Sequence, residues 1–147
     1  MKAMRRAALA RATCALAGMS WVLGGCAPMA PMATATSKSC SEPGTCNVIV
    51  KVVNCNVTMD PDDLHVYYGP QQIMWKIDDA SPNAKFTPDG IAFKSPTNEF
   101  THLQVTGSGR MAILIDANGR VGRYDYKVTL TDGGRTCTLD PGIINHG

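Results

Sequence analysis

The clearest structural pattern in this chain is Tyr124-Asp125-Tyr126-Lys127-Val128-Thr129-Leu130-Thr131. Aromatic and aliphatic side chains alternate in it with charged and polar ones. A period of two residues indicates a half-buried β-strand, because successive side chains of a strand point to opposite faces. We therefore expect a strand here that lays one apolar face on a hydrophobic core.

The same alternation recurs through the C-terminal two-thirds of the chain, and no long helical period interrupts it. Seven further groups carry it: Val48, Val50 and Val52; Leu64, Val66 and Tyr68; Ile73, Trp75 and Ile77; Ile91 and Phe93; Leu103 and Val105; Met111, Ile113 and Ile115, with Leu114 also apolar; and Cys137 and Leu139. Each group predicts one short strand.

Turn-forming residues separate these groups. They are Asp60-Pro61, Gly69-Pro70, Ser81-Pro82, Pro88-Asp89-Gly90, Ser95-Pro96, Gly107-Ser108-Gly109, Asn118-Gly119 and Gly133-Gly134. Each supplies either the fixed φ of proline or a residue that accepts positive φ. Short strands at this spacing predict a single all-β domain, an antiparallel-rich β-sandwich over residues 46–147.

The N-terminus has the composition of an export signal. Lys2, Arg5, Arg6 and Arg11 form a basic region, and residues 12–23 are uncharged and too short for a comfortable membrane span. Leu23-Gly24-Gly25-Cys26 resembles the bacterial lipobox, although Gly24 stands where Ala, Ser or Thr is commoner. The resemblance implies a helical signal peptide over residues 1–25, cleavage before Cys26, and lipidation with palmitate-like chains on that cysteine.

The segment after Cys26 reads as a spacer. Residues 26–45 are rich in Ala, Pro, Thr and Ser and have no periodicity, so we expect a flexible tether. Four of the fourteen Lys and Arg residues, and none of the Asp and Glu, lie in residues 1–25. The remainder therefore has ten basic against twelve acidic side chains, a net charge of −2, which gives no basic patch for nucleic acid.

Four cysteines follow the anchor, and an even number in an exported protein favours disulfides. Their spacings of six, nine and eighty-two residues match no common zinc pattern, and there is no CxxC motif. Of the three pairings that four cysteines allow, we prefer Cys40–Cys46, with Pro43-Gly44 as a turn, and Cys55–Cys137, which would join the start of the domain to its last strand.

The order of the motifs resembles a cupredoxin-like domain over about residues 46–145. The segments that carry the likeness are residues 62–66 with Gly69, Ile73-Met74-Trp75-Lys76-Ile77, residues 122–128, and residues 138–144. The resemblance implies a Greek-key sandwich. It does not extend to the type 1 copper site, which needs two His, a Cys and an axial Met. The segment after the Trp75 strand holds no His, and Cys137 has no nearby Met.

Other chemistry-bearing residues are scattered along the sequence. Residues of metal-ligand type are Met29 and Met32 in the tether, His65 with Met59 or Met74, which could form a Cu(I) site, and also His102, Met111 and His146. Tether residues and separate histidines are the simpler interpretation. Asp60, Asp62 and Asp63, or Asp78 and Asp79, could bind a cation. Asp116-Ala117-Asn118-Gly119 faintly resembles a calcium loop but is better explained as a hairpin turn.

The sequence carries no GxSxG or HExxH motif. We therefore predict a non-enzymatic envelope lipoprotein without cofactor or bound metal. It would be held by its lipid to a membrane, the outer one by the enterobacterial rule for Ala27, and would face the periplasm and an envelope protein partner. The alternative is a periplasmic copper-binding protein.

Overall fold

The computed structural model of the chain describes residues 39–40 and 43–147. Cys26, Met29 and Met32 lie outside these residues. The described part contains β1 (Ser39–Cys40), β2 (Thr45–Val53), β3 (Asn56–Asp60), β4 (Asp63–Val66), β5 (Gln71–Ile77), β6 (Ala84–Phe93), β7 (Phe100–Thr106), the 3₁₀ turn η1 (Gly107–Gly109), β8 (Met111–Asp116), β9 (Gly122–Asp132), β10 (Arg135–Leu139) and β11 (Gly142–Asn145). No helix in this part is long and apolar enough to cross a membrane.

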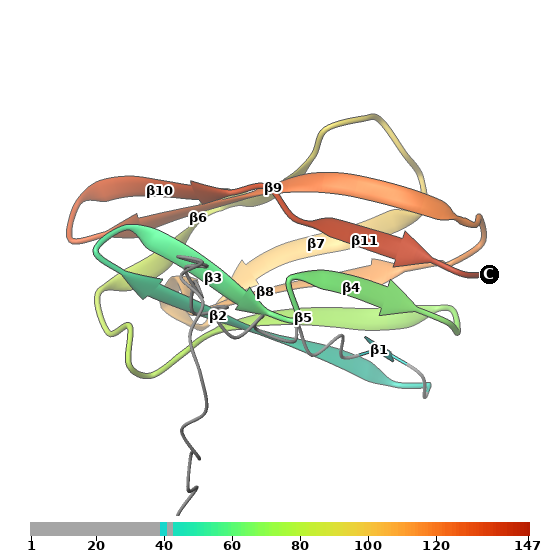
Figure 1. Ribbon diagram of the computed structural model, residues 1–147, viewed down its shortest axis with the longest axis horizontal. Helices are drawn as coiled ribbons and strands as arrows, with labels where there is room; N and C mark the ends of the chain where they lie inside the picture. The colour runs from blue at the N-terminus through green and yellow to red at the C-terminus, as the bar shows by residue number, and fades with distance from the viewer. Residues whose placement is uncertain (1–38, 41–42) are drawn as a thin grey trace, which may run out of the picture. The chain divides into compact units, whose positions relative to one another are not determined.

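The strands form two mixed sheets that face each other as a sandwich (Figure 1). One sheet has the order β1-β4-β11-β9-β10, with β6 also paired to β9; the other has the order β3-β2-β5-β8-β7. Within the described residues, six of the nine strand pairings are antiparallel, and β1–β4, β4–β11 and β2–β5 are parallel. The predicted all-β, antiparallel-rich sandwich is confirmed.

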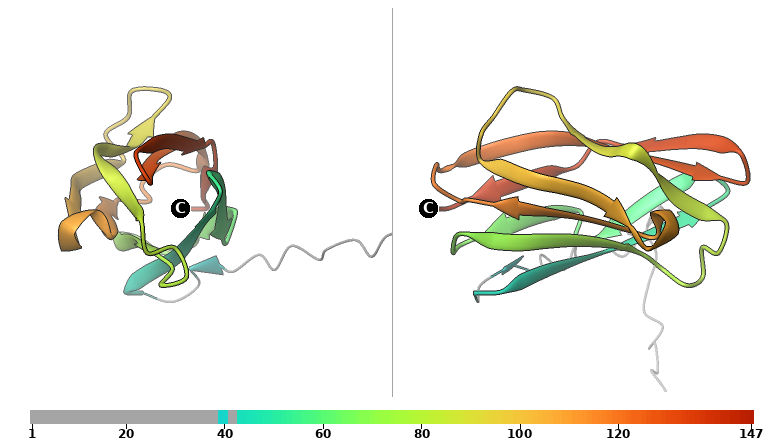
Figure 2. Two further views of the ribbon diagram at one scale, coloured as in Figure 1. Left: turned by 90° about the vertical axis from the view of Figure 1, so that its left-hand side faces the viewer. Right: turned by 180° about the vertical axis from the view of Figure 1, so that it is seen from behind.

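The apolar alternation of the sequence becomes the interior between the sheets. Seen along the strands, the two sheets enclose this interior (Figure 2, left). Buried side chains include Val48, Val50, Leu64, Ile73, Trp75, Ile77, Leu114, Val128, Leu130 and Ile143. Burial of such side chains contributes about 1.5–3 kcal/mol each, which makes this core the main source of stability.

Trp75 on β5 and Tyr126 on β9 connect the two sheets at the centre of the core. Both are fully buried, and the Trp75 indole Nε1–H donates to the Tyr126 hydroxyl over 3.0 Å. The rings meet edge to face, with centroids 5.6 Å apart. A buried polar group without a hydrogen-bond partner destabilises the folded state. This bond satisfies the indole N–H and the tyrosine hydroxyl together, so both rings can be buried without that cost.

Two stretches expected as simple turns have other roles. Pro88-Asp89-Gly90 lies inside β6, where the register against β9 shifts between Phe86 and Ile91 as a β-bulge. The hairpin expected at residues 116–119 is wrong: β8 belongs to one sheet and β9 to the other, so this segment crosses between the sheets. The positive φ expected there is present at Asn118, at 46°.

The described strands begin a few residues before the boundary expected at residue 46. Ser39 and Cys40 pair in parallel with His65 and Val66 of β4, and β2 starts at Thr45. Strand β1 gains its position from β4 and from the disulfide that follows it, not from apolar alternation, which two residues are too few to display.

Candidate functional site

Both preferred disulfides are present. Cys40 pairs with Cys46, with Cα atoms 5.6 Å apart, and Cys55 pairs with Cys137, with Cα atoms 5.2 Å apart. Cys40 on β1 and Cys137 on β10 belong to the first sheet. Cys46 on β2 and Cys55 in the β2–β3 turn belong to the second sheet. The disulfides therefore staple the sandwich across its two layers, and they leave no free thiolate among these four cysteines for a metal.

Three aromatic rings lie together at one end of the sandwich, which we call the C-terminal end. It is formed by residues 67–70 between β4 and β5, residues 117–121 between β8 and β9, and residues 146–147 after β11. Figure 1 shows the C-terminus there, beyond β4 and β11. The ring of Tyr67 stacks on that of His146 with centroids 4.1 Å apart, and His65 stacks beside His146 at 5.3 Å.

The two histidines of this cluster also contact each other directly. His65 Nδ1 lies 3.0 Å from His146 Nε2, a hydrogen bond in which either ring nitrogen can be the donor, depending on the tautomer. His65 is half-buried on the outer face of β4, and His146 is exposed. The main-chain N–H of His146 donates to the carbonyl of Val66 over 2.9 Å, which fixes the segment after β11 against β4.

A charged network lies on the same β4–β11–β9 surface. The Arg123 guanidinium donates to both carboxylate oxygens of Asp63, over 2.8 and 3.0 Å, and to Asp125 over 2.8 Å. These hydrogen bonds and the charge of Arg123 hold the pKa of Asp63 below its ordinary value, and they raise the pKa of Arg123. The predicted cation-binding role of Asp63 is thus replaced by an ion pair.

Buried polar groups lie under the C-terminal end. Asp116 and Asn145 are fully buried, and Asn145 Nδ2 donates to Asp116 Oδ1 over 3.0 Å. The main-chain N–H of Asn118 donates to the same oxygen over 2.8 Å. Burial raises the pKa of Asp116, with a smaller contribution from the charge of Glu99, whereas the two hydrogen bonds act in the opposite direction. Asp116 Oδ2 and Asn145 Oδ1 accept no hydrogen bond from the described residues.

Glu99 holds the crossing from β8 to β9, and the sequence analysis did not single it out. Its buried carboxylate accepts hydrogen bonds from the main-chain N–H groups of Gly119 and Arg120, over 2.8 and 3.3 Å. Its own carbonyl accepts from Ala117 N–H over 2.8 Å. A glutamate in a loop of polar residues looks solvent-exposed in sequence, so no local signal could reveal this role.

Gly69 brings two of the connections at this end into contact. A Cβ atom added to it would overlap the carbonyl oxygen of Ala117 and lie 2.6 Å from Asn118 Cβ. Only glycine fits this approach, because its lack of a side chain lets two backbones come together. The sequence flagged Gly69-Pro70 as a turn but could not show this packing.

The remaining sequence candidates are not brought together. Met59 is buried in the core on β3, whereas His65 faces outward on β4. His102 lies on the edge strand β7 at a bulge, has a positive φ of 56°, and its Nδ1 contacts Thr101 Oγ1 over 2.9 Å. Among the described residues, no group of three or more His, Cys, Asp or Glu is placed to hold a metal ion.

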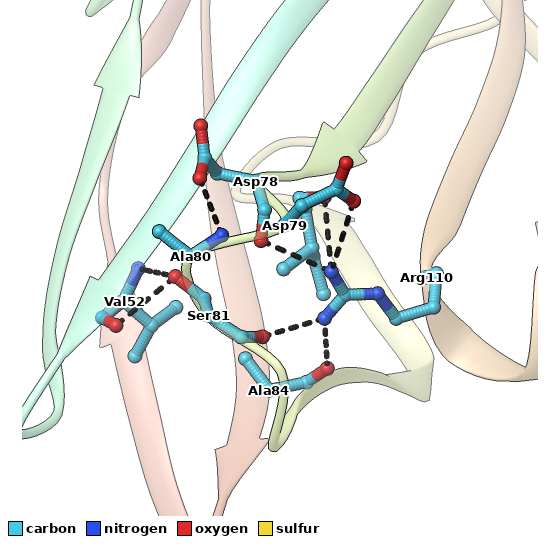
Figure 3. A network of polar contacts seen from close by, with 8 residues as sticks. Val52, Asp78, Asp79, Ala80, Ser81, Ala84 and Arg110 are labelled. Carbon is cyan, nitrogen blue, oxygen red and sulfur yellow. Dashed lines mark hydrogen bonds and ion pairs between the residues drawn. The ribbon is translucent and has the colours of Figure 1, made fainter.

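The opposite end of the sandwich is organised by Arg110 and Ser81 (Figure 3). Arg110 donates to four main-chain carbonyls of the β5–β6 connection: Ile77, Asp78, Ser81 and Ala84, over 2.6–3.3 Å. The buried Ser81 hydroxyl accepts from Val52 N–H and donates to Val52 C=O, as a neighbouring strand would. Asp78 Oδ1 accepts from Ala80 N–H over 2.7 Å, and Asp79 lies 3.8 Å from Arg110, so these carboxylates belong to the loop and not to a cation site.

A scan against protein-family models gives no match for this chain, and a search of curated proteins finds no significant relative. Function therefore has to be argued from the residues themselves.

Proposed function

We propose that this chain is an exported lipoprotein, anchored through lipid on Cys26, whose β-sandwich serves as a non-enzymatic binding module of the bacterial envelope. The observation that carries this proposal is the pairing of all four cysteines after the anchor in two disulfides. Disulfides persist in oxidising compartments and are rare in the cytosol. The disulfides and the lipobox-like Leu23-Gly24-Gly25-Cys26 thus agree on export.

The length of the tether would set how far the sandwich can lie from the membrane. Residues 27–38, about a dozen residues between the anchor and β1, would have an end-to-end distance of about 20 Å. A lipoprotein cysteine that carries two or more acyl chains is held stably, because one chain alone binds only marginally. The sandwich would then work close to the membrane surface, on the periplasmic side of the outer membrane.

The C-terminal end is the surface we favour for an envelope protein partner. Tyr67, Tyr68 and Val121 are exposed there by 40, 52 and 74 %. Tyrosine is enriched at protein interfaces, because its ring buries a large area while its hydroxyl retains a hydrogen bond. The backbone contacts of Glu99 and Gly69 give these loops a fixed arrangement, which lowers the entropy lost on binding.

Arg110, Glu99 and Oδ1 of Asp116 have structural partners, which supports a binding role over catalysis, although Asp116 Oδ2 and Asn145 Oδ1 accept no hydrogen bond from the described residues. Arg110 and Glu99 are each bonded to main-chain groups, and Asp116 to Asn118 and Asn145. The cupredoxin-like ancestry of this sandwich stays our hypothesis, and the copper-binding alternative takes its support from His65 and His146, as argued below.

Membrane fractionation with a cysteine substitution tests the anchor. We expect the wild-type protein in the membrane fraction, with incorporation of labelled palmitate, and a Cys26→Ser variant in the soluble periplasmic fraction without label. Cys14→Ser is the matched control, because it removes a cysteine of the signal region and leaves the lipobox intact. A Cys26→Ser variant that fractionates and labels like the wild type would show that Cys26 is not the anchor.

A further inference from the structure

The contact between His65 and His146 brings two ring nitrogens within reach of one metal ion. The ring centroids lie 5.3 Å apart, so the two nitrogens face each other head-on in a hydrogen bond, and both rings must turn before their lone pairs meet at an ion. Two nitrogens that each lie 2.0–2.1 Å from one metal ion, and are separated as His65 Nδ1 and His146 Nε2 are by 3.0 Å, subtend an angle of about 95° at that ion. An angle near 90° is that of adjacent ligands in a tetragonal complex, whereas a tetrahedral ion would need a wider one. Tetragonal geometry with nitrogen and oxygen ligands is typical of Cu²⁺ and Ni²⁺.

We propose that His65 and His146 form a surface site for a divalent transition-metal ion of tetragonal preference, with Cu²⁺ as the ion bound most tightly. Imidazole suits copper and nickel, and Cu²⁺ leads the affinity order of the first-row divalent ions. The site has two protein ligands, and water fills the remaining positions. It differs from the type 1 copper site of the family that this chain resembles, since Cys137 is held in a disulfide.

The fold brings these two rings together before any metal arrives. β4 and β11 pair in parallel with His65 opposite Ile144, so that the chain after Asn145 runs past the end of β4. The Val66 carbonyl holds the His146 main chain, and Tyr67 stacks on the His146 ring with an interplanar angle of 6°. Positioning by packing and hydrogen bonds raises affinity, because less rotamer freedom is lost on binding.

Metal binding requires that neither of the two facing nitrogens carries a hydrogen, and each neutral imidazole can adopt the tautomer that meets this requirement. In the metal-free pair, one of the two facing nitrogens carries a hydrogen and donates it to the other. In the bound state both facing nitrogens present lone pairs, with the hydrogens on His65 Nε2 and His146 Nδ1. Two carboxylates, Asp63 and Asp125, share the one guanidinium of Arg123, so this nearby network has a net negative charge that favours a bound cation.

Titration of the purified chain with Cu²⁺ alone tests the site. We expect one ion per chain at the strongest site, with an axial electron paramagnetic resonance spectrum whose splitting reports two nitrogen ligands. His65→Ala and His146→Ala should each weaken binding at least tenfold, since loss of an outer-shell partner alone costs roughly 10–100-fold. His102→Ala is the matched control and should bind Cu²⁺ like the wild type.

A second measurement locates the ion independently of affinity. Paramagnetic Cu²⁺ should broaden the nuclear magnetic resonance signals of Tyr67 and Ile144 and leave those of His102 sharp. The proposal is overturned if His65→Ala and His146→Ala, folded with both disulfides formed, bind Cu²⁺ as the wild type does, or if His102→Ala weakens binding equally. This site does not depend on Cys26, so a failed anchor experiment would leave it standing, and the reverse also holds.

Discussion

Asp116 is the residue whose chemistry departs furthest from its appearance in the sequence. It follows the apolar run Met111-Ala112-Ile113-Leu114-Ile115, where the sequence predicts the start of a turn, but it points into the sandwich and is fully buried. A buried carboxylate is costly when ionised, and burial favours its protonated form. Oδ2 accepts no hydrogen bond from the described residues, so a proton on it removes a charge that nothing there compensates.

This environment predicts a stability that falls as the pH rises. The pKa of Asp116 in the folded protein lies above its ordinary value of 3.8, so the folded state holds the proton more tightly than the unfolded state. Its contribution is fully present below about pH 4 and is lost as the pH rises through the folded pKa, by about 1.4 kcal/mol for each unit of difference. Asp116→Asn keeps the shape of the protonated acid and should flatten this dependence.

Urea denaturation between pH 4 and pH 8 measures the effect. We expect Asp116→Asn to be at least as stable as the wild type at pH 8, and the difference between the two proteins to shrink toward pH 4. Asp89→Asn, at an exposed position of β6, controls for the loss of one carboxylate. A variant that loses stability equally at every pH would contradict a raised pKa of Asp116.

For single residues, the sequence shows the type of each side chain but not which residue it contacts. His65 and His146 are eighty-one residues apart, and Asp116 and Asn145 are twenty-nine apart. Nothing in local alternation relates such pairs, because each contact follows from parallel strand pairing and from the crossing between sheets. The cysteines are the exception, since an exported protein with four cysteines has only three pairings to choose from.

At the scale of the elements, the strand predictions succeed wherever one face is apolar throughout. Val48, Val50 and Val52, and likewise Ile73, Trp75 and Ile77, all lie in the core. Tyr68 and Leu103 were expected to continue such faces but are exposed by 52 and 41 %. Tyr68 lies beyond the end of β4, and Leu103 lies in the bulge of the edge strand β7, where alternation no longer reports which face is inward.

The strand β8 shows a further limit of alternation. Its fully buried face is Ala112, Leu114 and Asp116, and the more apolar set Met111, Ile113 and Ile115 is half-buried. Both faces of the strand are thus at least partly covered. The inward face includes a carboxylate, which a hydrophobicity pattern counts as polar, so the sequence could not rank the two faces.

Arg110 gives a prediction for the β5–β6 connection. Replacement by alanine leaves the carbonyls of Ile77, Asp78, Ser81 and Ala84 without their charged donor, and hydrogen bonds to charged groups are worth more than neutral ones. We expect Arg110→Ala to lower the free energy of unfolding by about 2–4 kcal/mol. Arg110→Lys should recover only part, because an ammonium does not span four acceptors.

Chemical denaturation of these variants beside Arg120→Ala provides the comparison. Arg120 is 77 % exposed and makes one ion pair at 3.8 Å, so its loss should change stability by at most about 0.5 kcal/mol. Equal effects of Arg110→Ala and Arg120→Ala would show that the four carbonyl contacts do not stabilise the connection.

For the molecule as a whole, the two disulfides should differ in what they contribute. A cross-link stabilises chiefly by restricting the unfolded chain, and more so when it closes a longer loop. Cys55–Cys137 closes a separation of 82 residues and Cys40–Cys46 one of 6. The loop-entropy relation gives about 4.5 kcal/mol for the first and about 2 kcal/mol for the second.

Double replacement by alanine tests this difference. Cys55→Ala with Cys137→Ala should lose clearly more stability in urea than Cys40→Ala with Cys46→Ala. Each pair serves as the control for the other, since both remove two half-cystines from the same protein. A larger loss from the Cys40–Cys46 pair would mean that holding β1 in place outweighs restriction of the unfolded chain.

The same two bonds decide how the domain would carry a mechanical load. Under a pull between the chain ahead of Cys40 and the C-terminus, tension passes from Cys40 to Cys46, along β2 to Cys55, and then through the second bond to Cys137. Residues 56–136 lie inside a closed covalent loop and bear no tension. Only the ten residues 46–55 and the eleven residues 137–147 can straighten, which limits the extension to about 70 Å.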